Sequence, residues 1–192
     1  THFVARFRTL DPTSDVAVNL LDDAAEHTGN WADGVPDWYH WDDHRLVSWH
    51  IGSRHVPTDP ASDHEEPDSI RVAMVALSAY AVTGDQRYLD FCNDYGTKWA
   101  QALLEKPLPQ VAFSNSADVS QYDDDIEEYE ARIHRWELVA ASGMVDYFLD
   151  LYHITGTQLY ADALRAVVPV LIETVADPGN STSAALLAKY RR

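Results

Sequence analysis

Apolar residues divide the stretch 66–104 into two parts with different helical patterns. Residues 70–82 are apolar on almost every face, whereas residues 86–104 are apolar on one face only. A helix without a polar face has neighbours all round, and an amphipathic helix covers it and meets water. The pattern therefore predicts a buried helix and an antiparallel outer helix, joined by a tight Thr-Gly-Asp turn at residues 83–85.

The same pattern returns further along the chain at a constant offset, which indicates an internal repeat. The residues Tyr80, Thr83, Gly84, Gln86 and Tyr88 have identical counterparts at Tyr152, Thr155, Gly156, Gln158 and Tyr160. The two glycines stand where a left-handed residue can end a helix without a Cβ penalty. In the first turn, Asp85 can cap the returning helix by accepting from its first free N–H groups.

Repeated inner and outer helices predict an all-α domain built from antiparallel hairpins at 66–105 and 130–176. Such hairpins form all or part of an (α/α) toroid, or an open solenoid. In the second hairpin we expect an inner helix over about 132–154 and an outer helix over 158–175, bent by Pro169. A further inner helix is expected over 181–190.

The helical domain is expected to span 15–192, after an N-terminal segment 1–14 that begins with a strand-like alternation. A lone strand cannot pair with itself, so this segment is interpreted as the end of a β-domain. A short helix is expected over 15–27. The segments 30–66 and 110–128 have no sustained period, and connections of that length in compact domains are usually functional or disordered.

Composition limits the partners of the protein. The 192 residues suffice for one core, and no window has the apolar length that a membrane span needs. A net charge of −17 argues against nucleic acid and anionic membranes as general partners. The single cysteine, Cys92, excludes an internal disulfide and is expected in the core. A secreted or periplasmic location is favoured over a cytoplasmic one, and the oligomeric state is left open.

Polar and aromatic residues gather at the start of each predicted inner helix. The first group is His64, Glu65, Glu66 and Asp68, and the second is Arg132, His134, Arg135, Trp136 and Glu137. If the inner helices run parallel around an axis, their positive N-terminal ends meet in one concavity, which favours an anionic ligand such as a carboxylate. The segment 30–66 would cover the same end.

The sequence of residues 80–89, YAVTGDQRYL, resembles the hairpin turns of (α/α) toroid carbohydrate-active enzymes. These include polysaccharide lyases, unsaturated-uronyl hydrolases and other six-hairpin glycosidases. The resemblance covers about 66–175 and implies an architecture more strongly than a reaction, because the turn is shared across many activities. A strand before the toroid is also similar to lyases that join β-sandwich and toroid domains. Complete rings in those families have more hairpins than this sequence shows.

The resemblance implies a lyase that cleaves a uronate-containing polysaccharide by β-elimination. That reaction needs a cation or donor to neutralise the carboxylate, a base to take the C5 proton, and an acid for the leaving oxygen. The candidate carboxylate clamps are Arg54, Arg132 and Arg135. The candidate bases are His50, His55, His64 and His134, and the candidate acids are Tyr39 and Tyr122.

Two other functions stay open. A glycoside hydrolase on the same scaffold would use paired carboxylates, for which Asp42, Asp43, Glu65, Glu66, Asp68 and Glu137 are available. A non-catalytic helical-repeat module would only bind sugar or protein through its loops. In any of these proteins, Trp31, Trp38, Trp41 and Trp49 could stack on sugar rings or pack inside the loop, and Trp136 is a further candidate for substrate binding.

No cofactor is expected, although two patterns contain metal-binding residue types. His40 and His44 would share one face of a helix, a spacing that suits zinc, but the glutamate of the zinc-protease motif is absent. The acidic run 123–128 has oxygens for calcium but lacks the spacing of an EF-hand loop. The expected partner is therefore an acidic polysaccharide or oligosaccharide.

Overall fold

Helices make up most of the described chain, so the predicted helical class is confirmed. The computed structural model describes residues 11, 14–59, 62–65, 67–105 and 142–175, with side chains described as far as residue 169. Within these ranges the elements are α2 (Asp15–Glu26), β1 (Tyr39–His40), β2 (Arg45–Leu46), the 3-10 turn η1 (Pro67–Ser69), α3 (Ile70–Thr83), α4 (Gln86–Glu105), α7 (Met144–Thr155) and α8 (Gln158–Val175).

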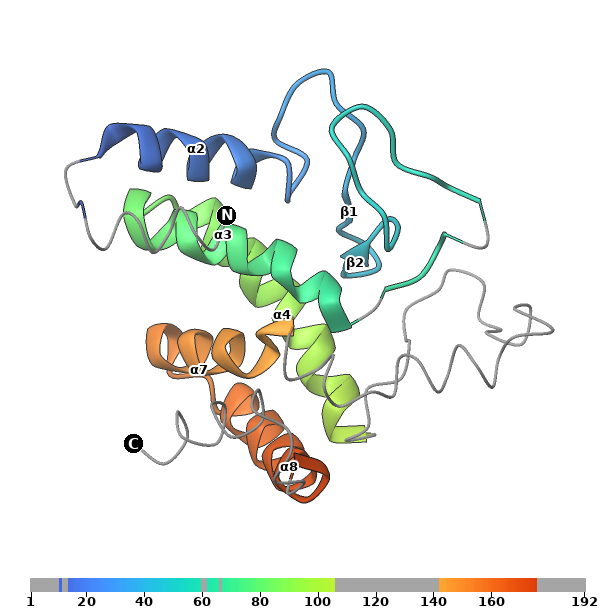
Figure 1. Cartoon of the computed structure of the whole chain (residues 1–192), viewed down its shortest axis with the longest axis vertical. Coiled ribbons are helices and arrows are strands. Elements are labelled where there is room, and N and C mark those ends of the chain that lie inside the picture. The colour runs from blue at the N-terminus through green and yellow to red at the C-terminus, as the bar shows by residue number, and fades with distance from the viewer. Residues whose placement is uncertain (1–10, 12–13, 60–61, 66, 106–141, 176–192) are drawn as a thin grey trace.

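The helices form two hairpins that lie side by side (Figure 1). Helix α3 is packed between α2 and α7, while α4 contacts α3 and α8. Helices α3 and α7 run in the same direction, and both begin on the side of the molecule where the β1–β2 hairpin lies (Figure 1). The two hairpins therefore have the relative orientation expected of repeated units. The ring itself stays a prediction, because two hairpins do not test whether a toroid closes.

The threonines of the two turns make the same two hydrogen bonds. Thr83 Oγ1 donates to the Ala79 carbonyl at 2.8 Å and accepts from the Asp85 N–H at 3.1 Å. In the second turn, Thr155 Oγ1 donates to its own i−4 carbonyl at 2.7 Å and accepts from the Thr157 N–H at 3.1 Å. A threonine at this position therefore closes one helix and fixes the residue that starts the next.

Both turn glycines adopt the predicted left-handed conformation. Gly84 has φ +72° and Gly156 has φ +69°, and each donates its N–H to the tyrosine carbonyl four residues earlier at 2.8 Å. The predicted cap is also confirmed, since Asp85 Oδ1 accepts from the Arg87 N–H at 3.0 Å. These local bonds explain why the sequence alone is sufficient to locate the turns.

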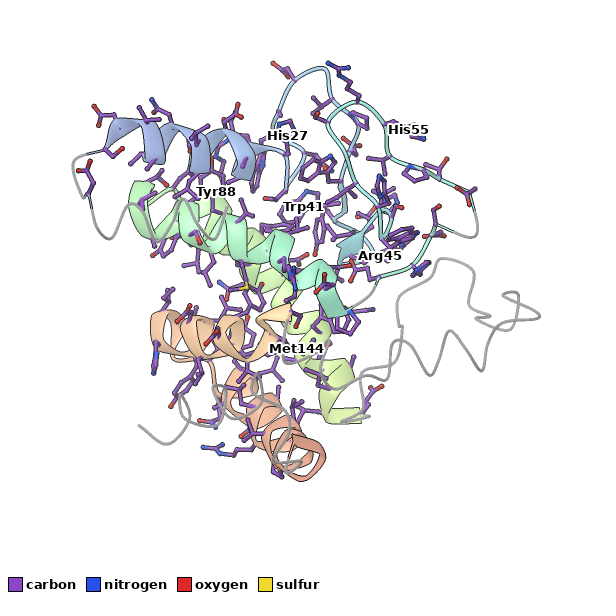
Figure 2. All side chains as sticks on the ribbon, in the orientation of Figure 1. His27, Trp41, Arg45, His55, Tyr88 and Met144 are labelled. Atoms are coloured by element: carbon purple, nitrogen blue, oxygen red, sulfur yellow. The ribbon has the colours of Figure 1, made fainter. Side chains whose placement is uncertain are left out.

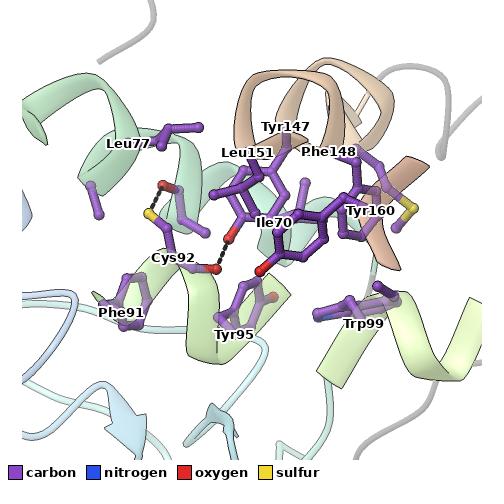
Figure 3. Close-up of a cluster of buried hydrophobic side chains, with 14 of the residues drawn as sticks. Ile70, Leu77, Phe91, Cys92, Tyr95, Trp99, Tyr147, Phe148, Leu151 and Tyr160 are labelled. Atoms are coloured by element: carbon purple, nitrogen blue, oxygen red, sulfur yellow. Dashed lines mark hydrogen bonds between the residues drawn. The ribbon is translucent and has the colours of Figure 1, made fainter. Parts of the chain in front are cut away.

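The core lies where α4 faces α3 and α7, and it is rich in aromatic side chains (Figure 3). Tyr147 donates its hydroxyl to the Cys92 carbonyl at 2.7 Å, and the Cys92 thiol donates to the Ala73 carbonyl at 3.3 Å. Burial raises the pKa of the Cys92 thiol well above its usual value. The predicted role of Cys92 as an inert core residue agrees with this position.

Helix α3 is less enclosed than its sequence predicts. Its buried side chains are Ile70, Ala73, Ala76, Leu77 and Ala79, which face α2, α4 and α7. Val72, Met74 and Val75 are only partly buried, and Ala81 is exposed. An apolar sequence on every face therefore does not mean complete burial among the described elements.

Within the described residues, Gly143 interrupts the second predicted inner helix. Helix α7 starts at Met144, after Gly143 in a left-handed conformation with φ +85°. Residues 132–141 of the predicted helix lie outside the described residues, as do the expected strand at 1–10, the connection 110–128 and the helix at 181–190. The outer helix was predicted correctly, because α8 spans Gln158–Val175. None of the helices in the described ranges combines the length and apolar content needed to cross a bilayer.

Candidate functional site

The irregular segment between α2 and η1 is built around a small β-hairpin. Asn30, in a left-handed conformation with φ +64°, lies at its base. The Asn30 side chain accepts from the N–H groups of Trp38 at 2.8 Å and Tyr39 at 3.0 Å, and donates to the Tyr39 carbonyl at 2.7 Å. Strand β1 pairs with β2 in the register Tyr39 to Leu46. One amide side chain therefore holds β1 through three hydrogen bonds.

The turn of this hairpin presents His44 to α4. His44 is also left-handed, with φ +56°, which is uncommon for a residue with a side chain and is found enriched at functional positions. The Nδ1 atom of His44 lies 2.8 Å from Asp94 Oδ1, and Tyr39 donates its hydroxyl to Asp94 Oδ2 at 2.7 Å. The ring of His44 is half-exposed. A carboxylate on Nδ1 orients an imidazole and leaves Nε2 to exchange a proton with a ligand.

A pocket of about 450 Å³ lies beside this histidine. Its other walls come from one polar face of α4, namely Asp90, Asn93, Asp94, Thr97, Lys98 and Gln101. The volume lies within the usual range for small-molecule sites, and each of the lining residues carries a polar or charged group. It offers amide, hydroxyl, carboxylate, ammonium and imidazole groups. Such a surface suits a ligand that has many hydroxyl groups.

Tyr39, a sequence candidate for the general acid, is buried behind this pocket. Burial, followed by the hydrogen bond and the negative charge of Asp94, raises the pKa of the Tyr39 hydroxyl far above its usual value. The hydroxyl already donates to Asp94, so the position of Tyr39 favours a role in fixing this carboxylate.

Glu65, a sequence candidate for catalysis, is completely buried between the loop and α4. Its carboxyl group accepts from the Leu46 N–H of β2 and from the Trp99 indole N–H, the latter at 3.0 Å. Burial raises the pKa of Glu65 to about 8, although these two hydrogen bonds and the nearby Arg45 act to lower it. The structure thus gives Glu65 protein partners and no exposed surface.

The remaining histidine candidates surround Trp49 in the same loop. The half-exposed Trp49 ring stacks on the buried His64 ring at a centroid distance of 6.1 Å and meets His50 edge-on at 5.4 Å. His55 and Arg54 are exposed, and Figure 2 shows His55 at the outer edge of the loop. Trp49 is therefore a supported aromatic surface, separate from the residues that line the pocket.

Trp38 and Trp41 have packing roles in the loop. Trp38 stacks on His27 at 5.0 Å and donates its indole N–H to the Gly52 carbonyl at 3.4 Å. Trp41 packs edge-on against Tyr39 and donates to the Gly29 carbonyl at 3.3 Å, with 38% of its surface exposed. Of these two, Trp41 has the larger surface available to a ligand.

The candidates of the second group lie outside the described residues. They are Arg132, His134, Arg135, Trp136 and Glu137, and the acid candidate Tyr122 also lies outside those residues. The predicted meeting of His64 and His134 in one hollow therefore stays a prediction.

The helical zinc pattern at His40 and His44 was wrong. His40 belongs to β1 and His44 to the following turn, so the two side chains do not share a helical face. Among the described residues, no group of three histidine, cysteine, aspartate or glutamate side chains is arranged to hold a metal ion. The acidic run 123–128 lies beyond those residues, and the expectation of no cofactor stays a prediction.

Sequence reasoning missed the pocket residues of α4. Asn93, Asp94, Thr97 and Lys98 fall on the polar side of an amphipathic helix, where solvated residues are ordinary. Their partner His44 lies fifty positions away in sequence, as the contact to Asp94 shows. The available signal was the spacing of Asn93, Asp94, Thr97, Lys98 and Gln101, which places them on one helical face.

Comparison with known proteins found no match for this chain among family models, curated proteins or solved structures. The relation to (α/α) toroid enzymes therefore continues to depend on the sequence pattern of the turns.

Proposed function

We propose that this protein is a polysaccharide lyase that cleaves a uronate-containing polymer by β-elimination in the pocket between His44 and α4. The observation that carries the proposal is the pairing of His44 with Asp94 at the edge of a polar pocket. A half-exposed imidazole whose Nδ1 is bonded to a carboxylate has the arrangement of a general base.

In the proposed reaction, Nε2 of His44 takes the C5 proton of a uronate residue. The electrons of that C–H bond form the C4–C5 double bond, and the bond from C4 to the glycosidic oxygen breaks. The leaving oxygen takes its proton from the imidazolium of His44, which returns to its neutral form. Asp94 holds the imidazole and stabilises its transient positive charge, so one histidine acts as base and then as acid.

Removal of the C5 proton requires stabilisation of the charge that develops on the uronate carboxylate. Lys98 and Asn93 line the same pocket and could supply an ammonium group and an amide donor. Gln101 and Thr97 add groups that can bind sugar hydroxyls. The pocket therefore offers one cation and several neutral donors to a uronate, beside the carboxylates of Asp90 and Asp94.

A glycoside hydrolase is the second candidate, since the pocket also contains the carboxylates of Asp90 and Asp94. Hydrolysis needs two carboxyl groups on opposite sides of the bond, about 5–10 Å apart. Asp90 and Asp94 stand one turn apart on α4 and so belong to the same wall. Asp94 also accepts from Tyr39, and Asp90 accepts from Gln86 at 2.9 Å. This arrangement supports elimination better than hydrolysis.

A screen of acidic polysaccharides with two readouts separates the candidate functions. A lyase generates an unsaturated uronate that absorbs in the ultraviolet, and it consumes no water. A hydrolase releases reducing ends without that absorbance, and a binding module retards the polymer in affinity electrophoresis without producing either signal. We expect ultraviolet absorbance and new reducing ends to appear together. New reducing ends without ultraviolet absorbance would show a hydrolase instead of a lyase. Binding without either product would show a non-catalytic binding module.

A further inference from the structure

The hairpin that presents His44 is too small to hold its own shape. Strands β1 and β2 have two residues each, and isolated two-stranded hairpins are marginal at best in water. Its geometry must therefore come from contacts outside the hairpin. Strand β1 is held by Asn30, and the hydroxyl of Tyr39 is bonded to Asp94.

Strand β2 is held by Glu65. Leu46 pairs with Tyr39 in the hairpin register, and its N–H donates to one oxygen of the Glu65 carboxyl group. The other oxygen accepts from the Trp99 indole of α4 at 3.0 Å. One buried side chain thus connects β2 to the helix that carries Asp94. His44 lies two residues before Leu46 on the same strand and turn.

A purely packing role does not account for an acid at this position. A buried carboxyl group costs free energy, and a hydrophobic residue of similar volume would avoid that cost. An apolar replacement, however, would leave the buried Leu46 N–H without an acceptor and would remove the acceptor that Glu65 gives the Trp99 indole N–H. A side chain with two acceptor oxygens satisfies both donors at once and sets the distance between β2 and α4.

We propose that Glu65 is a positioning residue for His44: by binding Leu46 and Trp99 together, it fixes the β1–β2 hairpin on α4 so that His44 meets Asp94. This inference gives a role within the proposed function to a residue that is too buried to touch substrate. Charged and titratable groups beside Glu65 are Arg45, which pairs with Asp63 at 2.7 Å, and Tyr95 and Tyr39.

The direct readout is the tautomer of the His44 ring, measured by ¹⁵N NMR on imidazole-labelled protein. The signal is assigned by its loss in His44→Gln. A neutral ring that donates from Nδ1 to Asp94 is protonated at Nδ1. Asp94→Asn is the reference, because its spectrum shows the His44 ring without that carboxylate. We expect Glu65→Ala to lose the Nδ1–H signal while circular dichroism remains helical. Glu65→Asp, whose shorter carboxylate does not span both donors, provides a second variant if Glu65→Ala does not fold.

A double variant separates the bridge from packing. In Glu65→Gln the amide group can accept from one donor only and turns its NH₂ toward the other, so we expect the Nδ1–H signal to weaken. Trp99→Phe breaks the same bridge from the α4 side, and we expect a similar loss. Because either change already breaks the bridge, the double variant should lose no more signal than each single variant. Losses that add in the double variant, or a Trp99→Phe protein that keeps the full signal, would contradict the bridge.

Turnover provides the second readout once a substrate is known. We expect kcat of Glu65→Asp to fall about 100-fold, the size of effect that a small displacement of a catalytic group produces, with KM little changed. A folded Glu65→Ala or Glu65→Asp protein that keeps the Nδ1–H signal would overturn the positioning role. A wild-type protein that cleaves no uronate polymer would overturn the proposed function, and the NMR result would still decide the role of Glu65.

Discussion

The two helical hairpins are built on the same turn but differ along their outer helices. At the start of α4 and α8, Gln86 and Gln158 each donate to an aspartate four residues later, Asp90 and Asp162, both at 2.9 Å. One turn further on, the agreement ends. The α4 residues Asn93, Asp94 and Thr97 correspond to Arg165, Ala166 and Pro169 in α8.

This difference separates scaffold from site within one chain. The repeated residues form the turn and the hydrogen bonds that join neighbouring helices. Tyr88 donates to Asp22 of α2 at 2.6 Å, and its counterpart Tyr160 donates to Asn93 of α4 at 3.0 Å. Apart from Asp90, the α4 residues that line the pocket beside His44 are not repeated in α8. Residues shared by the two hairpins therefore stabilise the fold, whereas residues that differ between α4 and α8 are available for chemistry.

The largest expected effect comes from Asp94, which corresponds to Ala166 in α8. Asp94→Asn keeps the size of the side chain but removes the negative charge that holds His44. We expect kcat to fall about 10²- to 10³-fold, within the range that general acid–base groups contribute. Asp162→Asn on α8 is the control, and it should leave turnover unchanged. Equal rates in wild type and Asp94→Asn would show that the pairing of His44 with Asp94 does not contribute to catalysis.

The second effect is a pH dependence of stability that arises in the loop region and has no source in the repeated turns. The pKa of Glu65 is raised from its usual 4.5 to about 8, so the folded protein holds a proton that the unfolded chain releases between these values. The contribution of Glu65 to stability is therefore greatest below pH 4.5 and decreases as pH rises towards 8, by at most about 1.4 kcal/mol per pH unit.

Urea unfolding at several pH values measures this slope. In Glu65→Gln the side chain does not titrate, and we expect a flatter dependence between pH 5 and 8 on that account. Comparison with wild type removes the contribution of the histidines, which both proteins share. Parallel curves for the two proteins would show that Glu65 does not titrate in the folded state as inferred.

A third effect tests how closely α7 packs against α4 at Gly96. A Cβ atom at Gly96 would lie 2.7 Å from Leu151 Cδ1 and 3.2 Å from the Tyr147 hydroxyl of α7. The corresponding residue of α8 is Val168. We expect Gly96→Val to lower the free energy of unfolding by about 1–3 kcal/mol, as overpacking in a core does. Chemical denaturation measures it, and an unchanged midpoint would contradict the close approach of α4 and α7.

The smallest effect compares the two turns directly. Gly84→Ala and Gly156→Ala each place a Cβ on a left-handed residue with open space around it, so only the backbone conformation opposes the change. We expect each to cost about 1–2 kcal/mol and the double variant to cost their sum. Thermal or urea unfolding provides the values. Clearly unequal costs would show that the turns are less equivalent than their hydrogen bonds indicate.

These comparisons also explain which elements could be predicted. The α3–α4 turn and helix α8 depend on local signals, namely helical periodicity, a left-handed glycine and an aspartate cap, so the sequence was sufficient. The start of the second inner helix, predicted at about residue 132, lies outside the described residues and stays a prediction, whereas its end, predicted at about Ile154, agrees with the end of α7 at Thr155.

The candidate site was predicted only in part, because its contacts are not local. The segment 30–66 was expected to be functional, and the β1–β2 hairpin with His44 lies inside it. His44 stands out as the candidate base only because it contacts Asp94. No spacing rule in the sequence connects a hairpin turn to a helix fifty positions later. Glu65 was selected because it is acidic and precedes an inner helix, and only its burial shows how it could act.

The central claim is that His44, held by Asp94, removes a proton from a uronate bound on α4. The most direct measurement is the ultraviolet absorbance of unsaturated product formed by wild type and by His44→Gln on the same uronate polymer, with polymer binding measured in parallel. We expect product from wild type, and binding without product from His44→Gln. Product formation by His44→Gln at the wild-type rate would contradict this claim.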